Sequence, residues 1–123
     1  MNEQQQILLD HYHDPRNFGK LNSATHTAKS QNLSCGDEIE VFLEIENDVI
    51  KNMKFVGEGC SISIATASMW SEAIKGKTID EVKALDYEDT LDLIGIPLTT
   101  SRLKCAMLSL DAIKRAISQI KLN

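Results

Sequence analysis

The chain has 123 residues, of which 42% are hydrophobic and 25% are charged, and its formal net charge is −5. These values are ordinary for a globular protein, and the length suits one domain, so we expect residues 1–123 to form a single domain. The acidic balance disfavours binding to nucleic acid or to an anionic membrane, because both require clustered Lys and Arg. No secretory signal and no apolar run long enough to span a bilayer is visible, so we expect a cytoplasmic protein without nucleic-acid or membrane partners.

The first half of the chain predicts a helix followed by strands. Apolar spacing predicts a helix over Glu3–His13, which Pro15 ends because proline disfavours helical geometry in the residue before it. Ile39, Val41, Leu43 and Ile45 alternate with acidic residues, apart from Phe42, and this period of two over 37–46 predicts a strand with one polar face. A short turn then leads into a second strand over 49–57, so the two should form a hairpin. Weaker alternation over 24–31 predicts a third strand.

The second half of the chain predicts helices. A helix over 62–75 should end at Gly76, and Thr78 with Glu81 has the spacing of a capping box for a short helix. Another short helix is expected within 86–93, and a long amphipathic helix from about Thr100 to the end. The sum is an α+β fold, a small antiparallel three-stranded sheet with helices packed on one face.

Three cysteines lie far apart in the sequence, each where a predicted element begins. Cys35 precedes the strongest strand by two residues, Cys60 directly precedes a helix, and Cys105 falls in the first turn of the last helix. Sites are usually built at such positions, and the positive end of a helix dipole favours a thiolate there. In a reducing compartment, an odd number of cysteines indicates metal or sulfur chemistry more than disulfides.

Each cysteine could instead be a small buried residue that fills space in the core. That interpretation is weakest for Cys35 and Cys60, which have glycine and carboxylate neighbours. It is strongest for Cys105, whose neighbours Ala106 and Met107 are apolar. The sequence separations match no zinc-finger pair, so spacing alone does not decide.

Asp37 is the natural fourth partner of the cysteines, because it lies two residues from Cys35 and both side chains could point the same way. Three thiolates and one carboxylate would complete a tetrahedral zinc site. Lys104, beside Cys105, could offset the negative charge or pair with Asp37 when no metal is bound. Asp37 could also be an ordinary carboxylate at the start of a strand.

The histidines are weaker candidates for metal binding. His11 and His13 are two residues apart, which places them on different faces of a helix, so solvated or loop-packing roles are expected for both. His26 lies in the weakest predicted strand and could approach the site.

Taken together, several motifs resemble those of the U-type iron–sulfur cluster assembly scaffolds, the family of the NifU N-terminal domain, IscU and SufU. The resemblance covers nearly the whole chain. The motifs are "HYHDPRN" at 11–17, "CGD" at 35–37, "GEGCSISIATASM" at 57–69, "KGKTIDEV" at 75–82 and "LKC" at 103–105.

The resemblance implies that Cys35, Asp37, Cys60 and Cys105 converge on one exposed end of the domain. There they would hold a transient [2Fe–2S] cluster, iron, or Zn²⁺ as the resting metal. The implied partners are a cysteine desulfurase that supplies sulfur, apo-proteins that accept the cluster, and an iron donor.

The sequence combines features of the SufU and IscU branches of the family. Lys104 before the third cysteine and Ser61 after the second are SufU-like, whereas IscU proteins place a histidine before the third cysteine. SufU proteins carry an insertion between the second and third cysteines, for which the 44 intervening residues leave no room. The stretch "IPLTTSR" at 96–102 stands where the IscU branch has the motif read by its chaperone.

The sequence is compatible with three functions. The first is a scaffold that receives sulfur and assembles a cluster. The second is a zinc-dependent sulfur acceptor for a SufS-type desulfurase, with Cys35 the persulfide acceptor by resemblance to SufU and Cys105 by resemblance to IscU. The third is a structural zinc domain, disfavoured because such sites are usually Cys₄ or Cys/His. No turnover by the chain itself is expected beyond sulfur transfer, since it has no evident acid–base pair and no phosphate-binding loop.

Overall fold

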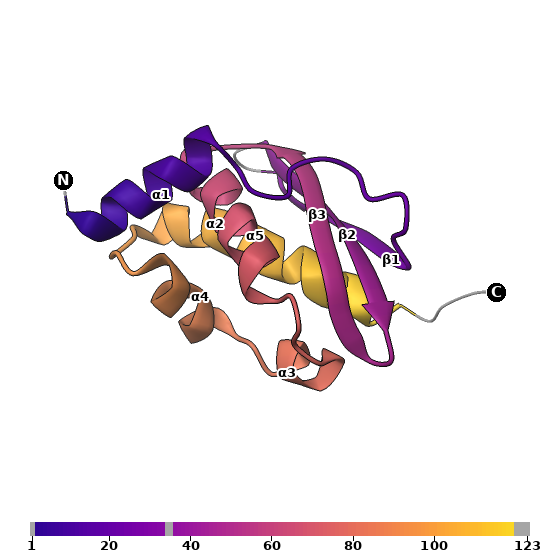
Figure 1. Cartoon of the computed structure of the whole chain (residues 1–123). Coiled ribbons are helices and arrows are strands. Elements are labelled where there is room, and N and C mark those ends of the chain that lie inside the picture. Colours follow the sequence, from indigo (N-terminus) through magenta and orange to yellow (C-terminus); the bar gives the residue numbers. More distant parts are fainter. Residues whose placement is uncertain (1, 34–35, 120–123) are drawn as a thin grey trace.

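The structure is a computed structural model that describes residues 2–33 and 36–119. The elements in chain order are α1 (Glu3–His13), β1 (His26–Asn32), β2 (Asp37–Glu46), β3 (Val49–Glu58), α2 (Ser61–Ala73), α3 (Ile79–Lys83), α4 (Tyr87–Ile94) and α5 (Thr100–Ile117). Figure 1 shows this order along the chain. The predicted α+β architecture is confirmed, and the predicted strands and the first four helices lie within a few residues of their expected bounds. The last helix starts at Thr100 as expected but ends at Ile117, before the end of the chain; residues 120–123, which the prediction included, lie outside the described residues.

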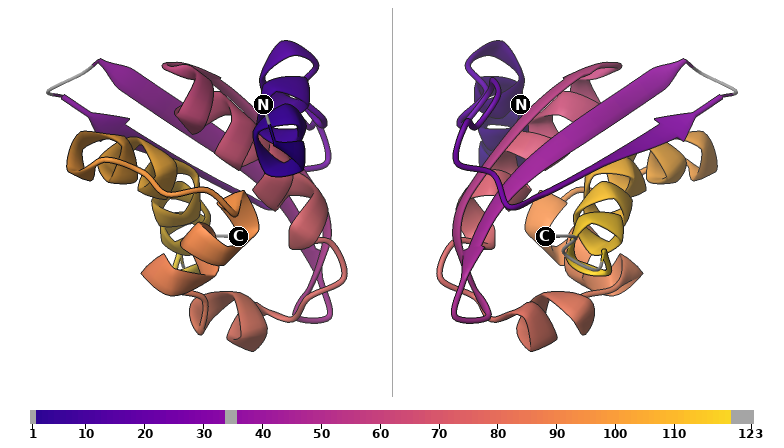
Figure 2. Two further views of the ribbon diagram at one scale, coloured as in Figure 1. Left: turned by 90° about the vertical axis from the view of Figure 1, so that its left-hand side faces the viewer. Right: turned by 90° about the vertical axis from the view of Figure 1, so that its right-hand side faces the viewer.

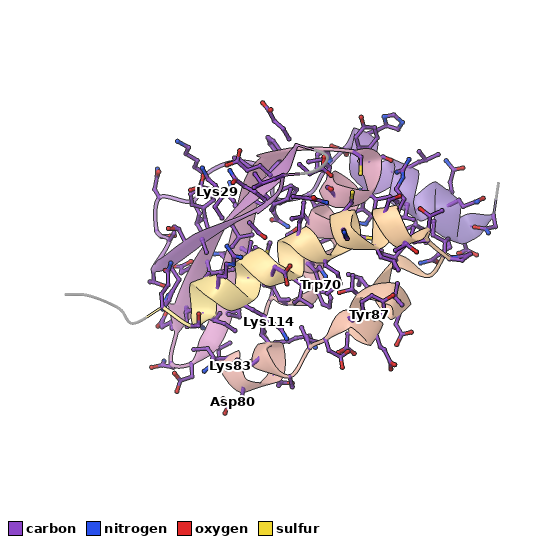
Figure 3. The ribbon with its side chains drawn as sticks, turned by 180° about the vertical axis from the view of Figure 1, so that it is seen from behind. Lys29, Trp70, Asp80, Lys83, Tyr87 and Lys114 are labelled. Atoms are coloured by element: carbon purple, nitrogen blue, oxygen red, sulfur yellow. The ribbon has the colours of Figure 1, made fainter. Side chains whose placement is uncertain are left out.

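The three strands form one antiparallel sheet in the order β1-β2-β3. The alternation of β2 sorts its side chains by face: Ile39, Val41 and Leu43 are fully buried, whereas the acidic residues between them face outward. On the outer face Lys29 of β1 pairs with Glu38 at 2.9 Å, and Figure 3 shows Lys29 projecting from the sheet. Phe42 is the exception, because it lies on this polar face and is nevertheless only 9% exposed.

Two long helices, α2 and α5, cover the inner face of the sheet, as the views in Figure 2 show. α2 is apolar or small on nearly all sides, and ten of its 13 residues are buried. That pattern is typical of a helix enclosed within a protein, here between the sheet, α1 and α5. The main core combines the inner sheet face with these helices and includes Phe55, Trp70 and Ile113.

The outer edge of β3 is covered by the loop that follows α1. Gly19 donates its backbone N–H to the carbonyl of Phe55 at 2.8 Å, and Phe55 donates to the carbonyl of Asn17 at 3.1 Å. Phe18 packs edge-on against the Phe55 ring, with 5.3 Å between the ring centroids. The segment therefore pairs with a strand edge that would otherwise carry unpaired backbone groups.

His11 joins α1 to α2, which corrects the expectation of a solvated or loop-packing role. It is only 9% exposed, and its Nδ1 lies 2.7 Å from the hydroxyl of Ser68 in α2. The same hydroxyl accepts the backbone N–H of Arg16 at 2.8 Å. His13, in contrast, is exposed, as the two-residue separation on a helix predicts. The role of His11 was missed because helical periodicity does not reveal that the opposing helix presents a serine.

Stability should therefore depend on pH through His11. Burial lowers the pKa of His11 from its usual 6.5; the charge of Arg16 acts in the same direction, and Glu72 opposes it. The unfolded chain binds the proton more readily than the folded chain. The stability that neutral His11 contributes to the folded state is therefore fully present above about pH 6.5 and is lost as the pH falls through the folded-state pKa. We expect His11→Gln to flatten the fall in the free energy of unfolding as the pH drops below about 6.5, measured by urea denaturation at several pH values. The exposed His13→Gln variant should keep the wild-type slope; if His11→Gln kept it too, the link would be refuted.

The short helices after α2 begin at capping residues. Thr78 Oγ1 accepts the backbone N–H of Glu81 at 3.1 Å, and the Glu81 carboxylate accepts that of Thr78 at 2.9 Å, which confirms the predicted capping box. Asp86 caps α4 in the same reciprocal way with Asp89. Figure 3 labels Tyr87 at the start of α4, and the end of α4 contacts α1, because Gln4 Nε2 donates to the Ile94 carbonyl at 3.1 Å. No helix in the described ranges is both long and apolar enough to cross a membrane.

Candidate metal centre

Three potential ligands from three separate elements meet at the end of the sheet opposite the β2–β3 turn. Asp37 is the first residue of β2, Cys60 immediately precedes α2, and Cys105 lies on α5. One carboxylate oxygen and the two Sγ atoms all lie within 4.8 Å of one another. The antiparallel pairing explains the meeting of the first two, because β2 begins at the sheet end where β3 leads into α2.

Asp37 is buried, with 5% of its surface exposed. Ser63 donates its hydroxyl to Asp37 Oδ2 at 2.6 Å. Behind the carboxylate lies Gly59, where a Cβ would stand 2.9 Å from Asp37 Cγ and 3.1 Å from Ser63 Cβ. A glycine is therefore needed at this position so that the chain entering α2 can pass close to the carboxylate.

The other glycine of the "GEGC" motif has a related role. At Gly57 a Cβ would collide with the backbone carbonyl of Glu38 and lie 2.8 Å from the end of the Ile39 side chain. The two glycines thus allow β3 and the chain after it to approach β2 closely, which brings Cys60 beside Asp37. Sequence inspection singled out the motif but not this steric reason for it.

Cys60 is the N-cap residue of α2, with φ −71° and ψ 170°, as the sequence predicts. Its side chain makes no capping hydrogen bond, and it is half-buried. The thiol therefore lies at the positive end of the α2 dipole, near backbone N–H groups that have no partner within the helix. The Cys60 sulfur at this helix start lies within 4.8 Å of the other two candidate ligand atoms.

Cys105 occupies a different position from the one predicted. α5 begins at Thr100, so Cys105 is the sixth helical residue, one turn deeper than the expected first turn. The helix dipole acts mainly within the first turn, so it does not activate this thiol. Cys105 is 6% exposed and packs in a second apolar cluster with Leu8, Ile62 and Ala106. Cys105 is both a core residue and one of the three clustered candidate ligands. The core interpretation and the metal-site interpretation of this cysteine therefore do not exclude each other.

The three ligands line an open cavity of about 630 Å³. Its remaining walls come from Asn32 at the end of β1 and from the start of α5, which contributes Thr100, Ser101, Arg102 and Lys104. Lys104 is exposed at the rim, and in the part of the chain that the structure describes it forms no ion pair with Asp37. The predicted pairing is therefore not found, although Lys104 and Arg102 together place two positive charges beside the thiols.

The prediction for Cys35 falls outside the described residues. The preceding strand ends at Asn32, which pairs in register with Asp37, and Gly36 has φ 75°, a left-handed conformation that favours glycine.

His26 is far from the metal centre. It pairs with Leu43, whereas Asn32 pairs with Asp37. Six residues of strand therefore separate His26 from the site, about 20 Å at 3.3 Å per residue. His26 Nδ1 instead lies 2.8 Å from Thr25 Oγ1.

Ser63 is a further residue of the candidate site, which the sequence did not reveal. It is 1% exposed, and besides its bond to Asp37 its Oγ lies 3.7 Å from Cys60 Sγ and 3.5 Å from the carbonyl oxygen of Cys105. One feature of the sequence could have indicated that Ser63 lies near Cys60. Ser63 follows Cys60 by three positions at the start of a helix, which places both on the same face.

The donor set fits a thiophilic divalent ion. Thiolates on one tetrahedral zinc lie about 3.8 Å apart, given Zn–S bonds of about 2.3 Å. The observed separations of at most 4.8 Å therefore need only a small contraction. Two soft sulfur donors suit zinc and iron, whereas Mg²⁺ and Ca²⁺ prefer oxygen alone.

Comparisons with known proteins identify the family of this chain. Residues 3–122 match the NifU-like N-terminal domain family. The zinc-dependent sulfurtransferase SufU of Bacillus subtilis is 37% identical, with 93% of this chain and 88% of SufU aligned. The iron–sulfur cluster assembly protein IscU of Plasmodium falciparum is 39% identical, over 93% of this chain and 71% of IscU. A crystal structure of SufU from Fervidobacterium islandicum, described as a candidate scaffold of the SUF system, superposes with a TM-score of 0.79 at 25% identity, covering 96% of each chain.

The alignment with the Bacillus protein extends over 131 positions, more than the 123 residues of this chain. The relative therefore carries residues that have no counterpart here.

Proposed function

This chain belongs to the NifU-like N-terminal domain family, and from that membership we propose that it is an iron–sulfur cluster assembly scaffold. It would receive sulfur from a cysteine desulfurase and hold a transient [2Fe–2S] cluster, or zinc at rest, on Cys35, Asp37, Cys60 and Cys105. The observation that carries the proposal is the convergence of Asp37, Cys60 and Cys105 within 4.8 Å beside an open cavity. Cys35 is included because it lies two residues from Asp37 in the sequence.

Sulfur arrives by exchange between a thiolate and a persulfide. A thiolate of this chain attacks the outer sulfur of the desulfurase persulfide, a new S–S bond forms, and the desulfurase cysteine leaves as a thiolate. The attacking group must be reachable from solvent. The burial of Cys105 opposes direct attack by that thiol, so we propose Cys35 as the acceptor. Arg102 and Lys104 at the cavity rim would stabilise the negative charge gathered there.

The cluster is cargo, so its ligands must also release it. Among the proposed ligands Asp37 is the hard oxygen donor, and oxygen binds iron and zinc less tightly than thiolate in such a mixed set. We propose that Asp37 is the ligand that exchanges first when an acceptor protein supplies its own thiolate.

Asp37→Ala should therefore slow cluster transfer by about tenfold, a change typical of groups that tune a metal site. The measurement is the rate at which a reconstituted cluster passes to an apo-ferredoxin, followed by the change in visible circular dichroism. Glu38→Ala is the matched control, because Glu38 is the next residue but pairs with Lys29 on the outer face of the sheet. Faster transfer from Asp37→Ala would contradict the proposed role.

A second candidate function is a zinc-dependent sulfur acceptor for a SufS-type desulfurase. It is favoured by Lys104 directly before Cys105 and by the 37% identity to a protein named as a zinc-dependent sulfurtransferase. In that case zinc would hold the loops, and a thiolate released from it would become the attacking group. The chain would then act in sulfur transfer and would assemble no cluster itself.

One experiment separates the two functions. The protein is incubated anaerobically with ferrous iron, cysteine and a cysteine desulfurase, and its visible spectrum and bound persulfide are recorded. A scaffold gives the absorption of a [2Fe–2S] cluster and passes it to an acceptor protein. Persulfide on the chain with zinc retained and no cluster would support the sulfur acceptor. An iron donor is a further partner that the reconstitution can test by its effect on rate.

A further inference from the structure

The Ser63 hydroxyl lies among the three candidate ligands of the metal centre but is not itself a proposed ligand. Its oxygen is 2.6 Å from Asp37 Oδ2, 3.7 Å from Cys60 Sγ and 3.5 Å from the Cys105 carbonyl oxygen. The residue is 1% exposed and sits in the first turn of α2, so water does not compete for these contacts.

A serine hydroxyl carries one hydrogen, so Ser63 can donate to one partner at a time. The Asp37 carboxylate is the better acceptor, because it is charged and nearly 1 Å closer than the carbonyl of Cys105. The serine oxygen then keeps its lone pairs for a donor, and the thiol of Cys60 lies within reach of a weak S–H···O bond. The resulting chain of contacts runs from Cys60 through Ser63 to Asp37.

The bond to Ser63 occupies one of the two oxygens of Asp37. Gly59 has no Cβ and so leaves free the space beside Cγ and Oδ1 of Asp37 that a larger residue would fill. One carboxylate oxygen, meanwhile, lies within 4.8 Å of both thiol sulfurs. The hydrogen bond from Ser63 thus favours one orientation of the carboxylate, and Gly59 provides the space for that orientation.

We propose that Ser63 is a positioning residue of the metal centre, which holds Asp37 through Oδ2 and so presents the carboxylate to a metal shared with Cys60 and Cys105. The inference rests on the proposed function, because it assumes that these side chains bind metal. Outer partners that orient metal ligands typically change affinity by about 10- to 100-fold when they are removed. Ser63 should contribute to metal affinity on that scale, although it does not touch the metal.

The test measures binding of Co²⁺ to the metal-free full chain, followed by the sulfur-to-cobalt charge-transfer absorption under anaerobic conditions. Ser63→Ala should weaken binding by roughly 10- to 100-fold. Ser63→Thr, which keeps the hydroxyl, should restore most of the affinity. Ser61→Ala is the matched control, because it removes a hydroxyl two residues away on the same helix and should leave the affinity unchanged.

A double-mutant cycle distinguishes positioning from a general effect on folding. If Ser63 acts through Asp37, Ser63→Ala should cause little further loss of affinity in a chain that already carries Asp37→Ala. An equal loss in both backgrounds would overturn the proposal, as would unchanged Co²⁺ affinity in Ser63→Ala. If even the unaltered chain gave no charge-transfer band with Co²⁺, the proposed function itself would fail, which is a different result from the failure of Ser63 alone.

Discussion

Replacing either Cys60 or Cys105 by serine should lower zinc affinity by about 100-fold or more. A structural zinc site with four protein ligands binds with roughly 10–16 kcal/mol, so one lost thiolate corresponds to about 3 kcal/mol. Cys60 immediately precedes α2, Cys105 lies within α5, and the two are 45 positions apart in the sequence. Equal losses from both replacements are therefore expected only if both sulfurs bind one ion.

The measurement is competition for Zn²⁺ against a chelator of known affinity, at a fixed pH, because thiolate ligands make zinc binding depend on pH. Ser101→Ala is the control, since Ser101 lines the same cavity without being a proposed ligand. If Cys60→Ser abolished binding while Cys105→Ser left it unchanged, Cys105 would be a core residue only, and the shared site would be refuted.

Gly59→Ala should disturb the metal centre without altering any proposed ligand. The added Cβ would lie 2.9 Å from Asp37 Cγ and 3.1 Å from the Cβ of Ser63, so the carboxylate must shift and its bond to Ser63 must break. Overpacking of this kind typically costs about 1–3 kcal/mol of stability. We expect a comparable loss in the free energy of unfolding of the metal-free chain, together with a fall in zinc affinity of at least about tenfold.

Urea denaturation and zinc competition, measured on the same preparation, separate the two effects. Glu58→Ala is the matched variant, because Glu58 lies between the two glycines and is exposed. It should change neither quantity appreciably. Wild-type zinc affinity in Gly59→Ala would mean that the orientation of Asp37 does not matter for binding.

Local sequence patterns were sufficient to predict the fold of this chain. The alternation of Ile39, Val41 and Leu43 with acidic residues defines both the strand and its buried face. The capping box of Thr78 with Glu81 marks the start of α3. Such patterns work because strand and helix periods are local properties of the backbone.

The metal centre was only partly predictable. The positions of Asp37 at the start of β2 and of Cys60 at the start of α2 follow from element boundaries, which the sequence marks well. The helix start predicted at Thr100 already puts Cys105 beyond the first turn, so its assignment to that turn was wrong on the sequence alone. What the sequence does not determine is which turn of α5 reaches Asp37 and Cys60, because that depends on the packing of α5 against α2 and the sheet. Ser63 and Gly59 were missed for the same reason, since their roles depend on contacts with a residue more than 20 positions away.

The most direct test of the shared site is X-ray absorption at the zinc edge of the zinc-loaded protein. If Cys35, Asp37, Cys60 and Cys105 share one zinc ion, it has three sulfur ligands at about 2.3 Å and one oxygen at about 2.0–2.2 Å. Two or fewer sulfur ligands, or a shell made only of nitrogen and oxygen, would contradict the shared site.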